Sequence, residues 1–328
     1  MNKHAKTLLL LCVLGIIVVV VILQRTKQDT NTNSPNSSPA TTQQNNDGSS
    51  FIESLRNRDY EPSQITVESK LANNGVYIGY FISYQSDDLK IYARMNVPSG
   101  EAPTNGFPVV ILNHGYFSTS SFTSGDGTLT MADILARNGY LTLASDYRGF
   151  GKSENDGQGS RGHKPEYAID VLNLIASIPN VEKANPSKIG MWGHSMGGEV
   201  ALRSGEATDK LKALVLWAPT SARVSDNARF YGGRRPPESA TNTPDNSEMD
   251  GASPANYLRY ISTPISLHQG LADTEVNPQW SKELNEALQK EGKSVEYFEY
   301  PGQDHNFRNL GWDVISKRTI DFFDQYLK

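Results

Sequence analysis

The chain has 328 residues, of which 37% are hydrophobic and 20% are charged, and its formal net charge is −5. This length allows one large α/β domain with a substantial buried core, or two smaller domains. No dense block of lysine and arginine occurs, which argues against a nucleic-acid-binding surface.

An uninterrupted apolar segment, LLLLCVLGIIVVVVIL, occupies residues 8–23 and follows a short N-terminal tail, residues 1–7. A helix of this length spans about 24 Å, slightly less than the bilayer core of about 30 Å, and flanking lysines can extend its reach. The residues that follow, Gln24 to Lys27, offer no small-x-small cleavage site. The segment therefore predicts an uncleaved transmembrane signal anchor, with a cleaved signal peptide as the alternative.

Residues 24–50 are almost all Asn, Gln, Ser, Thr and Asp. Such a segment buries too little apolar surface to offset its ordering entropy, so it predicts a disordered polar linker. Basic residues flank the apolar segment almost evenly, and a short tail before a large domain favours a single-pass protein with the folded domain, residues 51–328, outside the cytoplasm. The only cysteine, Cys12, lies within the apolar segment, which excludes an intrachain disulfide.

Two β-rich segments, 76–84 and 89–97, flank a polar turn and predict an antiparallel hairpin. Short apolar segments typical of strands covered on both faces follow at 108–114, 140–146, 187–193, 211–219, 263–270 and 294–300. Helical stretches are expected near 129–138, 165–177, 196–207, 278–291 and 312–327. This alternation predicts an α/β fold with a mostly parallel sheet, helices on both faces and an antiparallel N-terminal hairpin.

Residues 220–256 have little periodicity and are rich in Gly, Pro, Asn and Ser. A gap this long within a compact domain is usually functional or disordered. Its position after the sixth predicted strand indicates a cap-like insertion or a pocket rim. Arg234 and Arg235 within it are interpreted as solvated loop residues in preference to ligands for an anionic substrate group.

Gly193-His194-Ser195-Met196-Gly197 fits the pattern G-x-S-x-G. The pattern alone is weak, but here a predicted strand precedes it and a predicted helix with small residues follows it. That is the context of a nucleophile elbow, in which a strained serine crowds its neighbours. The sequence therefore predicts that Ser195 is a nucleophile.

A serine hydroxyl needs a base within hydrogen-bond reach, and the base needs a carboxylate to orient it. His305 follows the last predicted strand in YPGQDHNF and is the predicted base. Asp273 follows the seventh predicted strand in HQGLADTEVNP and completes the expected order of Ser, acid and His. Glu275 and Asp304 are the competing carboxylates.

The oxyanion requires backbone N–H donors that are in place before the charge develops. We expect one from Met196, directly after the nucleophile, and the second from Tyr116, with Phe117 as its alternative. The Tyr116 hydroxyl is a further possible donor. The segment RGFGKS (148–153) lacks the first glycine of a phosphate-binding loop, and no residue cluster has metal-ligand spacing, so no cofactor and no metal are predicted.

The motifs PVVILNHG, ASDYRGFGKS, KIGMWGHSMGG, HQGLADTEVNP and YPGQDHNF occur in the order expected for the α/β-hydrolase fold. Over residues 75–328 the chain resembles the catalytic domain of the prolyl oligopeptidase (peptidase S9) family and its dienelactone-hydrolase-like esterase relatives. The resemblance implies Ser195 as nucleophile, Asp273 and His305 as its partners, and acyl transfer to water through an acyl-enzyme.

The expected function is therefore that of a membrane-tethered serine hydrolase that cleaves peptide, amide or ester bonds. Full peptidases of the family carry an N-terminal propeller, for which about 25 residues between linker and hydrolase domain leave no room, and the chain lacks the Glu-Glu pair of dipeptidyl peptidases. A carboxylesterase acting on small esters is the alternative, followed by a non-catalytic hydrolase-like binding module. The expected partners are a small ester or short peptide and the membrane, without nucleic acid; the sequence leaves the oligomeric state open.

Overall fold

The computed structural model describes residues 50–157, 164–232, 246–308 and 312–328. The predicted tail (1–7), anchor (8–23) and linker up to residue 49 lie outside these residues and stay predictions. Within the described ranges, no helix combines the length and the apolar character needed to cross a membrane. The first described helix, α2 (Phe51–Asn57), begins at Ser50, whose side chain and that of Glu53 form a reciprocal capping box.

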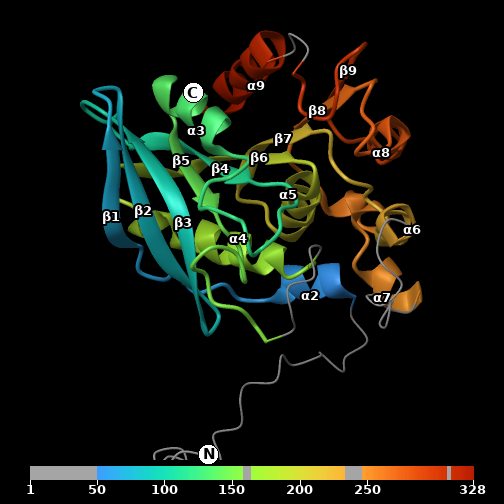
Figure 1. The fold of residues 1–328 in the computed structure, drawn as a ribbon, viewed down its shortest axis with the longest axis horizontal. Helices are drawn as coiled ribbons and strands as arrows, with labels where there is room; N and C mark the ends of the chain where they lie inside the picture. The colour runs from blue at the N-terminus through green and yellow to red at the C-terminus, as the bar shows by residue number, and fades with distance from the viewer. Residues whose placement is uncertain (1–49, 158–163, 233–245, 309–311) are drawn as a thin grey trace, which may run out of the picture. The chain divides into compact units, whose positions relative to one another are not determined.

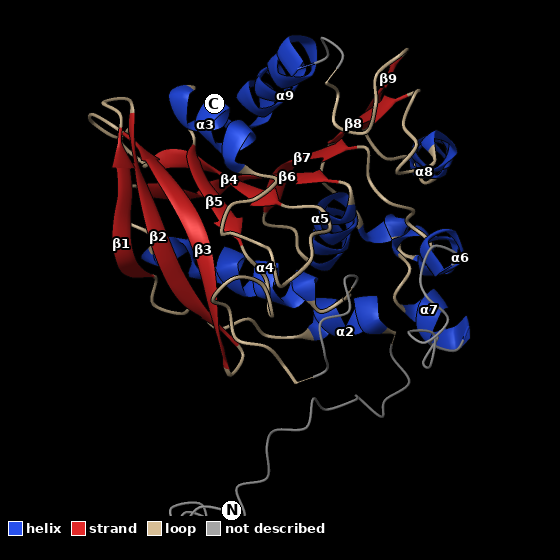
Figure 2. Cartoon of the chain, in the orientation of Figure 1, coloured by secondary structure: helices blue, strands red, loops and turns tan. Residues whose placement is uncertain are grey.

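The described strands form one nine-stranded sheet with the order β1-β2-β3-β5-β4-β6-β7-β8-β9 (Figures 1 and 2). Their bounds are β1 Thr66–Asn73, β2 Tyr77–Ser86, β3 Leu89–Pro98, β4 Phe107–Asn113, β5 Leu141–Ser145, β6 Ala184–His194, β7 Leu211–Trp217, β8 Ile265–Gly270 and β9 Val295–Tyr300. The strands β1, β2 and β3 pair antiparallel, β3 pairs antiparallel with β5, and all later pairs are parallel. The predicted α/β class with a mostly parallel sheet is confirmed.

Helices cover both faces of the sheet, as predicted. The bounds of the main ones are α3 Leu129–Arg137, α4 Tyr167–Ser177, α5 Met196–Ala207, α8 Pro278–Lys290 and α9 Trp312–Leu327. The helices α3 and α9 pack on one face, where they bury a cluster that includes Leu135 and Phe323. The helices α2, α4, α5 and α8 lie over the other face and its larger core cluster (Figure 1).

The apolar strand segments are buried on both faces because helices cover both sides of the sheet. All seven residues of β4 are buried, and so are all five of β5 and all six of β8. This two-sided burial explains why the sequence of these strands is continuously apolar and does not alternate.

The edge strand β1 is the element that the sequence analysis missed. Its described side chains are exposed, and its pairing with β2 is irregular, with shifts between Val67 and Ser69 and between Lys70 and Ala72. An exposed edge strand has no buried face, so its sequence carries no apolar period from which to recognise it. The predicted hairpin is therefore part of a longer antiparallel region, β1-β2-β3-β5.

The described part of the predicted cap-like insertion (220–256) is more ordered than its sequence indicates. It contains the helices α6 (Val224–Gly232) and α7 (Asn246–Gly251) and a 3₁₀ turn, Pro254–Asn256. Residues 233–245, which include Arg234 and Arg235, lie outside the described residues. Asn227 on α6 ties this segment to the domain, because its side-chain amide donates to the backbone oxygen of Ser221 and to the carboxylate of Glu199 on α5.

Candidate active site

Ser195 occupies a sharp turn between the end of β6 and the start of α5. Its φ of 58° and ψ of −124° lie in a region that non-glycine residues rarely adopt, so the backbone is strained there. Gly193 and Gly197 permit the turn, because a Cβ on the first would collide with the backbone of the second, and a Cβ on Gly197 would collide with the backbone of Asn113. The strand, strained serine and helix form the predicted nucleophile elbow, with the Ser195 side chain half-buried.

Backbone hydrogen bonds hold the elbow against the neighbouring strand. The Ser195 N–H donates to the oxygen of Trp217 at 3.0 Å, and the Ser195 oxygen accepts from the N–H of Thr220 at 3.1 Å. Trp217 is the last residue of β7, and Thr220 is the first residue of the cap-like insertion. The backbone of Ser195 is therefore hydrogen-bonded both to the end of β7 and to the start of the insertion.

Asp273 and His305 follow β8 and β9, which are adjacent parallel strands, and both side chains are buried. The Nδ1 atom of His305 lies 2.7 Å from Oδ2 of Asp273. The other carboxylate oxygen of Asp273 accepts the backbone N–H groups of Glu275 and Val276 at 2.8 and 2.9 Å. A carboxylate can only accept, so Nδ1 of His305 carries the proton and Nε2 is left as the basic nitrogen.

Burial by itself would raise the pKa of Asp273. The hydrogen bond and the charge of His305, together with the N–H groups of Val276 and Glu275, outweigh it, and the pKa is lowered below its ordinary value. Asp273 is therefore ionised at neutral pH and can hold the imidazole in one tautomer.

The structure separates Asp273 from the two competing carboxylates. Asp304 accepts from the guanidinium of Arg308 at 2.8 Å, and its other oxygen accepts two backbone N–H groups of its own loop. Glu275 donates its backbone N–H to the carboxylate of Asp273, and Glu275 is itself exposed to solvent. Asp273 is thus the carboxylate that the fold brings to His305.

His194, which directly precedes Ser195, contacts the segment of the predicted base, His305. Its Nε2 lies 2.9 Å from the backbone oxygen of His305, and the two imidazole ring centroids are 4.5 Å apart. Burial, followed by the charge of His305, lowers the pKa of His194 to about 4. Sequence reasoning missed this contact, because its acceptor is a backbone carbonyl and any residue type can supply one.

The two predicted oxyanion donors belong to segments that flank Ser195. Met196 is the first residue of α5, so its N–H has no acceptor within the helix. The loop after β4 approaches Ser195 closely, because a Cβ on Gly115 would lie 3.2 Å from the Ser195 Cβ. Tyr116 follows in this loop with 59% of its surface exposed, whereas Phe117 packs near His114 and Phe122. The role of each N–H stays a prediction.

The remaining described histidines have structural surroundings. His114 lies among aromatic rings, the nearest being Tyr147 at 4.3 Å between centroids, and burial lowers its pKa to about 4. His268 lies between the hydroxyl groups of Ser266 and Tyr300. His4 and His163 lie outside the described residues.

The segment RGFGKS follows β5, and its Arg148 forms a buried ion pair with Asp170 at 2.8 Å. Among the residues that the structure describes, no group of three or more His, Cys, Asp or Glu side chains could hold a metal ion.

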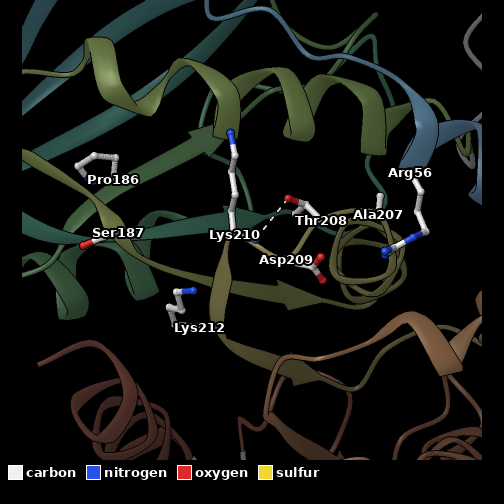
Figure 3. Close-up of a pocket in the computed structure, with 8 residues that line it drawn as sticks. All are labelled: Arg56, Pro186, Ser187, Ala207, Thr208, Asp209, Lys210 and Lys212. Atoms are coloured by element: carbon white, nitrogen blue, oxygen red, sulfur yellow. Dashed lines mark hydrogen bonds between the residues drawn. The ribbon is translucent and has the colours of Figure 1, made fainter.

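Figure 3 shows the residues that line a surface cavity of about 530 Å³. It is lined by Arg56, Pro186, Ser187, Ala207, Thr208, Asp209, Lys210 and Lys212. Pro186 and Ser187 lie near the start of β6 and Ser195 follows its end, so this cavity opens at the opposite edge of the sheet and is separate from the candidate site.

The nine-stranded sheet, its helix layers and the turn at Ser195 have the arrangement of the α/β-hydrolase fold. The prolyl oligopeptidase family matches residues 128–328, which is more than half of the chain. The chain therefore belongs to the prolyl oligopeptidase family.

Two curated proteins are similar to part of this chain. The quorum-quenching protein AidA of Acinetobacter baumannii is 27% identical over 157 residues, which cover 46% of this chain and 47% of AidA. Human protein ABHD12B is 23% identical over 217 residues, covering 62% of this chain and 57% of ABHD12B. The chain thus spans about half the length of the curated relatives it matches.

Solved structures with the same fold include both esterases and peptidases. Acetyl xylan esterase 1 from a Thermoanaerobacterium species superposes with a TM-score of 0.63 at 18% identity, covering 83% of this chain and 90% of the esterase. Pyrococcus horikoshii acylaminoacyl peptidase gives a TM-score of 0.64 at 18% identity, covering 83% of this chain and 51% of the peptidase. At this identity the likeness concerns the fold.

Proposed function

We propose that this protein is a membrane-tethered serine hydrolase in which Ser195, His305 and Asp273 act as a catalytic triad. The observation that carries the proposal is the 2.7 Å contact between Asp273 and His305 at the sheet edge where the strained Ser195 follows β6. Ser195 supplies the nucleophile, His305 the base, and Asp273 holds the tautomer that leaves Nε2 free to accept a proton.

In the acylation step, Nε2 of His305 takes the Ser195 proton while Oγ bonds to the substrate carbonyl carbon. The oxyanion that forms is stabilised by the N–H groups of Met196 and Tyr116. The tetrahedral intermediate collapses as its bond to the leaving group breaks, and His305 donates its proton to that group. His305 then takes a proton from water, the resulting hydroxide attacks the acyl-enzyme, and the acid is released as Ser195 recovers its proton.

A small ester is the substrate class that we favour over a peptide. The described domain corresponds to 90% of an acetyl xylan esterase chain, and this likeness supports a small-ester substrate.

The test compares hydrolysis of a short-chain aryl ester and an aminoacyl-prolyl arylamide by the full chain, with Ser195→Ala as the blank. We expect turnover of the ester well above that of the amide, and stoichiometric labelling of Ser195 by a fluorophosphonate. Comparable cleavage of the amide would assign a peptidase. If neither substrate is hydrolysed faster than by the blank, and Ser195 is not labelled, the triad is refuted and the non-catalytic binding module is supported.

The tether rests on the apolar segment 8–23, whose composition suits a bilayer span. We expect the full chain to stay with membranes after an alkaline carbonate wash, and a chain without residues 8–23 to be released. Protease added to intact cells should then degrade the domain, since it is placed outside the cytoplasm. Release of the full chain by the wash, or protection of the domain, would contradict the tether or its orientation respectively.

A further inference from the structure

We propose that His194 is a positioning residue, which holds the backbone of His305 at a fixed distance from Ser195 and thereby keeps the base aligned with the nucleophile. The inference rests on the proposed function, because it concerns the alignment of two members of the proposed triad.

The contact joins the segment of Ser195 to the segment of His305. His194 is linked to Ser195 by one peptide bond, and its Nε2 lies 2.9 Å from the backbone oxygen of His305. A carbonyl oxygen can only accept, so Nε2–H of His194 is the donor. One covalent link and one hydrogen bond therefore connect the nucleophile to the backbone of the base.

Other contacts hold the His305 segment on either side of this point. The indole N–H of Trp312 donates to the backbone oxygen of Asn306 at 2.9 Å, and the backbone oxygen of Gln303 accepts from the N–H of Ala272 at 2.9 Å. These bonds tie the segment to α9 and to the acid loop. The His194 bond is the one that ties His305 itself to the elbow, so it acts on the separation that matters for proton transfer.

The properties of the His194 ring suit a donor that must stay uncharged. The titratable groups that act on it are His305, whose ring centroid is 4.5 Å away, and Asp273. The indole of Trp192 also stacks near the His194 ring, with 6.3 Å between the centroids. Burial lowers its pKa to about 4, so the ring is neutral where the enzyme would work. A neutral neighbour does not oppose the positive charge that His305 gains in the transition state.

Two substitutions separate the donor from the ring. His194→Gln places an amide N–H near the position of Nε2 without an imidazole, whereas His194→Phe keeps a ring and removes the donor. Because small misplacements of a catalytic group can lower a rate about a hundredfold, we expect His194→Phe to lower kcat for the aryl ester by about ten- to a hundredfold with KM unchanged. His194→Gln should stay within about threefold of the native kcat.

The opposite order would overturn the inference. If His194 only fills space, His194→Phe will have a higher kcat than His194→Gln, or kcat will fall in both variants in parallel with their melting temperatures. Thermal unfolding of both variants therefore accompanies the kinetics, and equal kcat values in native protein and His194→Phe also count against a positioning role.

A measurement on the native protein covers the case in which His194→Phe does not fold. In protein labelled with ¹⁵N histidine, we expect the His194 ring to be neutral, with its proton on Nε2, throughout pH 5.5–8. A positively charged ring in this range, or a neutral ring protonated on Nδ1, would overturn the proposal.

Failure of the inference is distinguishable from failure of the proposed function. If native protein neither hydrolyses the ester nor reacts with a fluorophosphonate, both fall together. If native protein is active and Ser195→Ala is not, but His194→Phe retains native kcat, the triad stands and the role of His194 alone is refuted.

Discussion

The imidazole of His305 lies against the carboxylate of Asp273, with 2.7 Å between Nδ1 and Oδ2, although 32 residues separate the two in the chain. The two residues follow adjacent parallel strands, β8 and β9, whose ends meet at one edge of the sheet. The loop after β8 turns two of its own N–H groups onto the same carboxylate, so Asp273 is held in place before any substrate arrives.

Asp273→Asn should lower kcat for the aryl ester by about 10³- to 10⁴-fold, because an amide nitrogen facing Nδ1 favours the wrong imidazole tautomer. The shape of the side chain is nearly unchanged, so the melting temperature should change far less than the rate. The matched control is Glu275→Gln, which keeps the backbone N–H that Glu275 donates to Asp273 and should leave kcat within about twofold. A large loss in the control and a small one in Asp273→Asn would move the role of acid to Glu275.

Gly197→Ala should destabilise the domain, because the added methyl group would collide with the backbone of Asn113, which cannot move independently of β4. We expect a loss of at least about 2 kcal/mol in the free energy of unfolding, as for overpacked cores, together with a loss of activity. Gly205→Ala in the same helix is the control. Its methyl group would meet only the flexible end of Leu214 at 3.3 Å, so the free energy of unfolding should change by less than about 1 kcal/mol. Urea denaturation measures the free energy of unfolding of both variants. A change for Gly197→Ala as small as that expected for Gly205→Ala would show that the elbow tolerates a side chain at position 197.

Asp170→Ala should be strongly destabilising, because it leaves the buried guanidinium of Arg148 without its closest carboxylate. Asp170 is fully buried and accepts hydrogen bonds from three nitrogen atoms of Arg148, among them the backbone N–H at 2.8 Å. Breaking a buried pair from one side costs about 3–5 kcal/mol. The exposed pair of Lys317 and Asp321 offers the comparison, and Asp321→Ala should change the free energy of unfolding by less than about 0.5 kcal/mol. Similar values for the two variants would contradict the structural role assigned to Arg148.

Asp146 should make the domain less stable as the pH rises. Burial raises the pKa of Asp146 to about 7, against the opposing hydrogen bonds from Ser124 and Gly125. In the folded protein the carboxyl therefore keeps its proton where the unfolded chain has already lost it, so the contribution to stability is full below about pH 4 and is lost as the pH rises towards 7.

Asp146→Asn removes this dependence. Among the described residues, Oδ2 of Asp146 has no hydrogen-bond partner, and an amide in its place carries no charge. The free energy of unfolding of the variant minus that of the native protein should increase from pH 4 to pH 8, by at most about 4 kcal/mol. Denaturant unfolding at the two pH values measures the difference, and a gap that is constant or shrinks with pH would contradict the raised pKa.

The sequence alone determined the class of the fold and the place of the elbow. Continuous apolar strands report burial on both faces because every residue of such a strand contacts a helix layer, and β4, β5 and β8 follow that pattern. Gly193 and Gly197 stand out because the turn at Ser195 leaves no room for a Cβ at either position. These requirements are local, so they determine which residue types occur at these positions and can be recognised in the sequence.

The tertiary structure decided what depends on loops meeting in space. Asp273, Glu275 and Asp304 all carry a carboxylate in the loops after β8 and β9. In the folded chain these loops direct Asp273 towards His305 and Asp304 towards Arg308. The strand β1 escaped recognition because exposed edge residues have no apolar period. The bond between His194 and the carbonyl of His305 was equally hidden, since a backbone acceptor has no residue type of its own and is revealed only when the chain is folded.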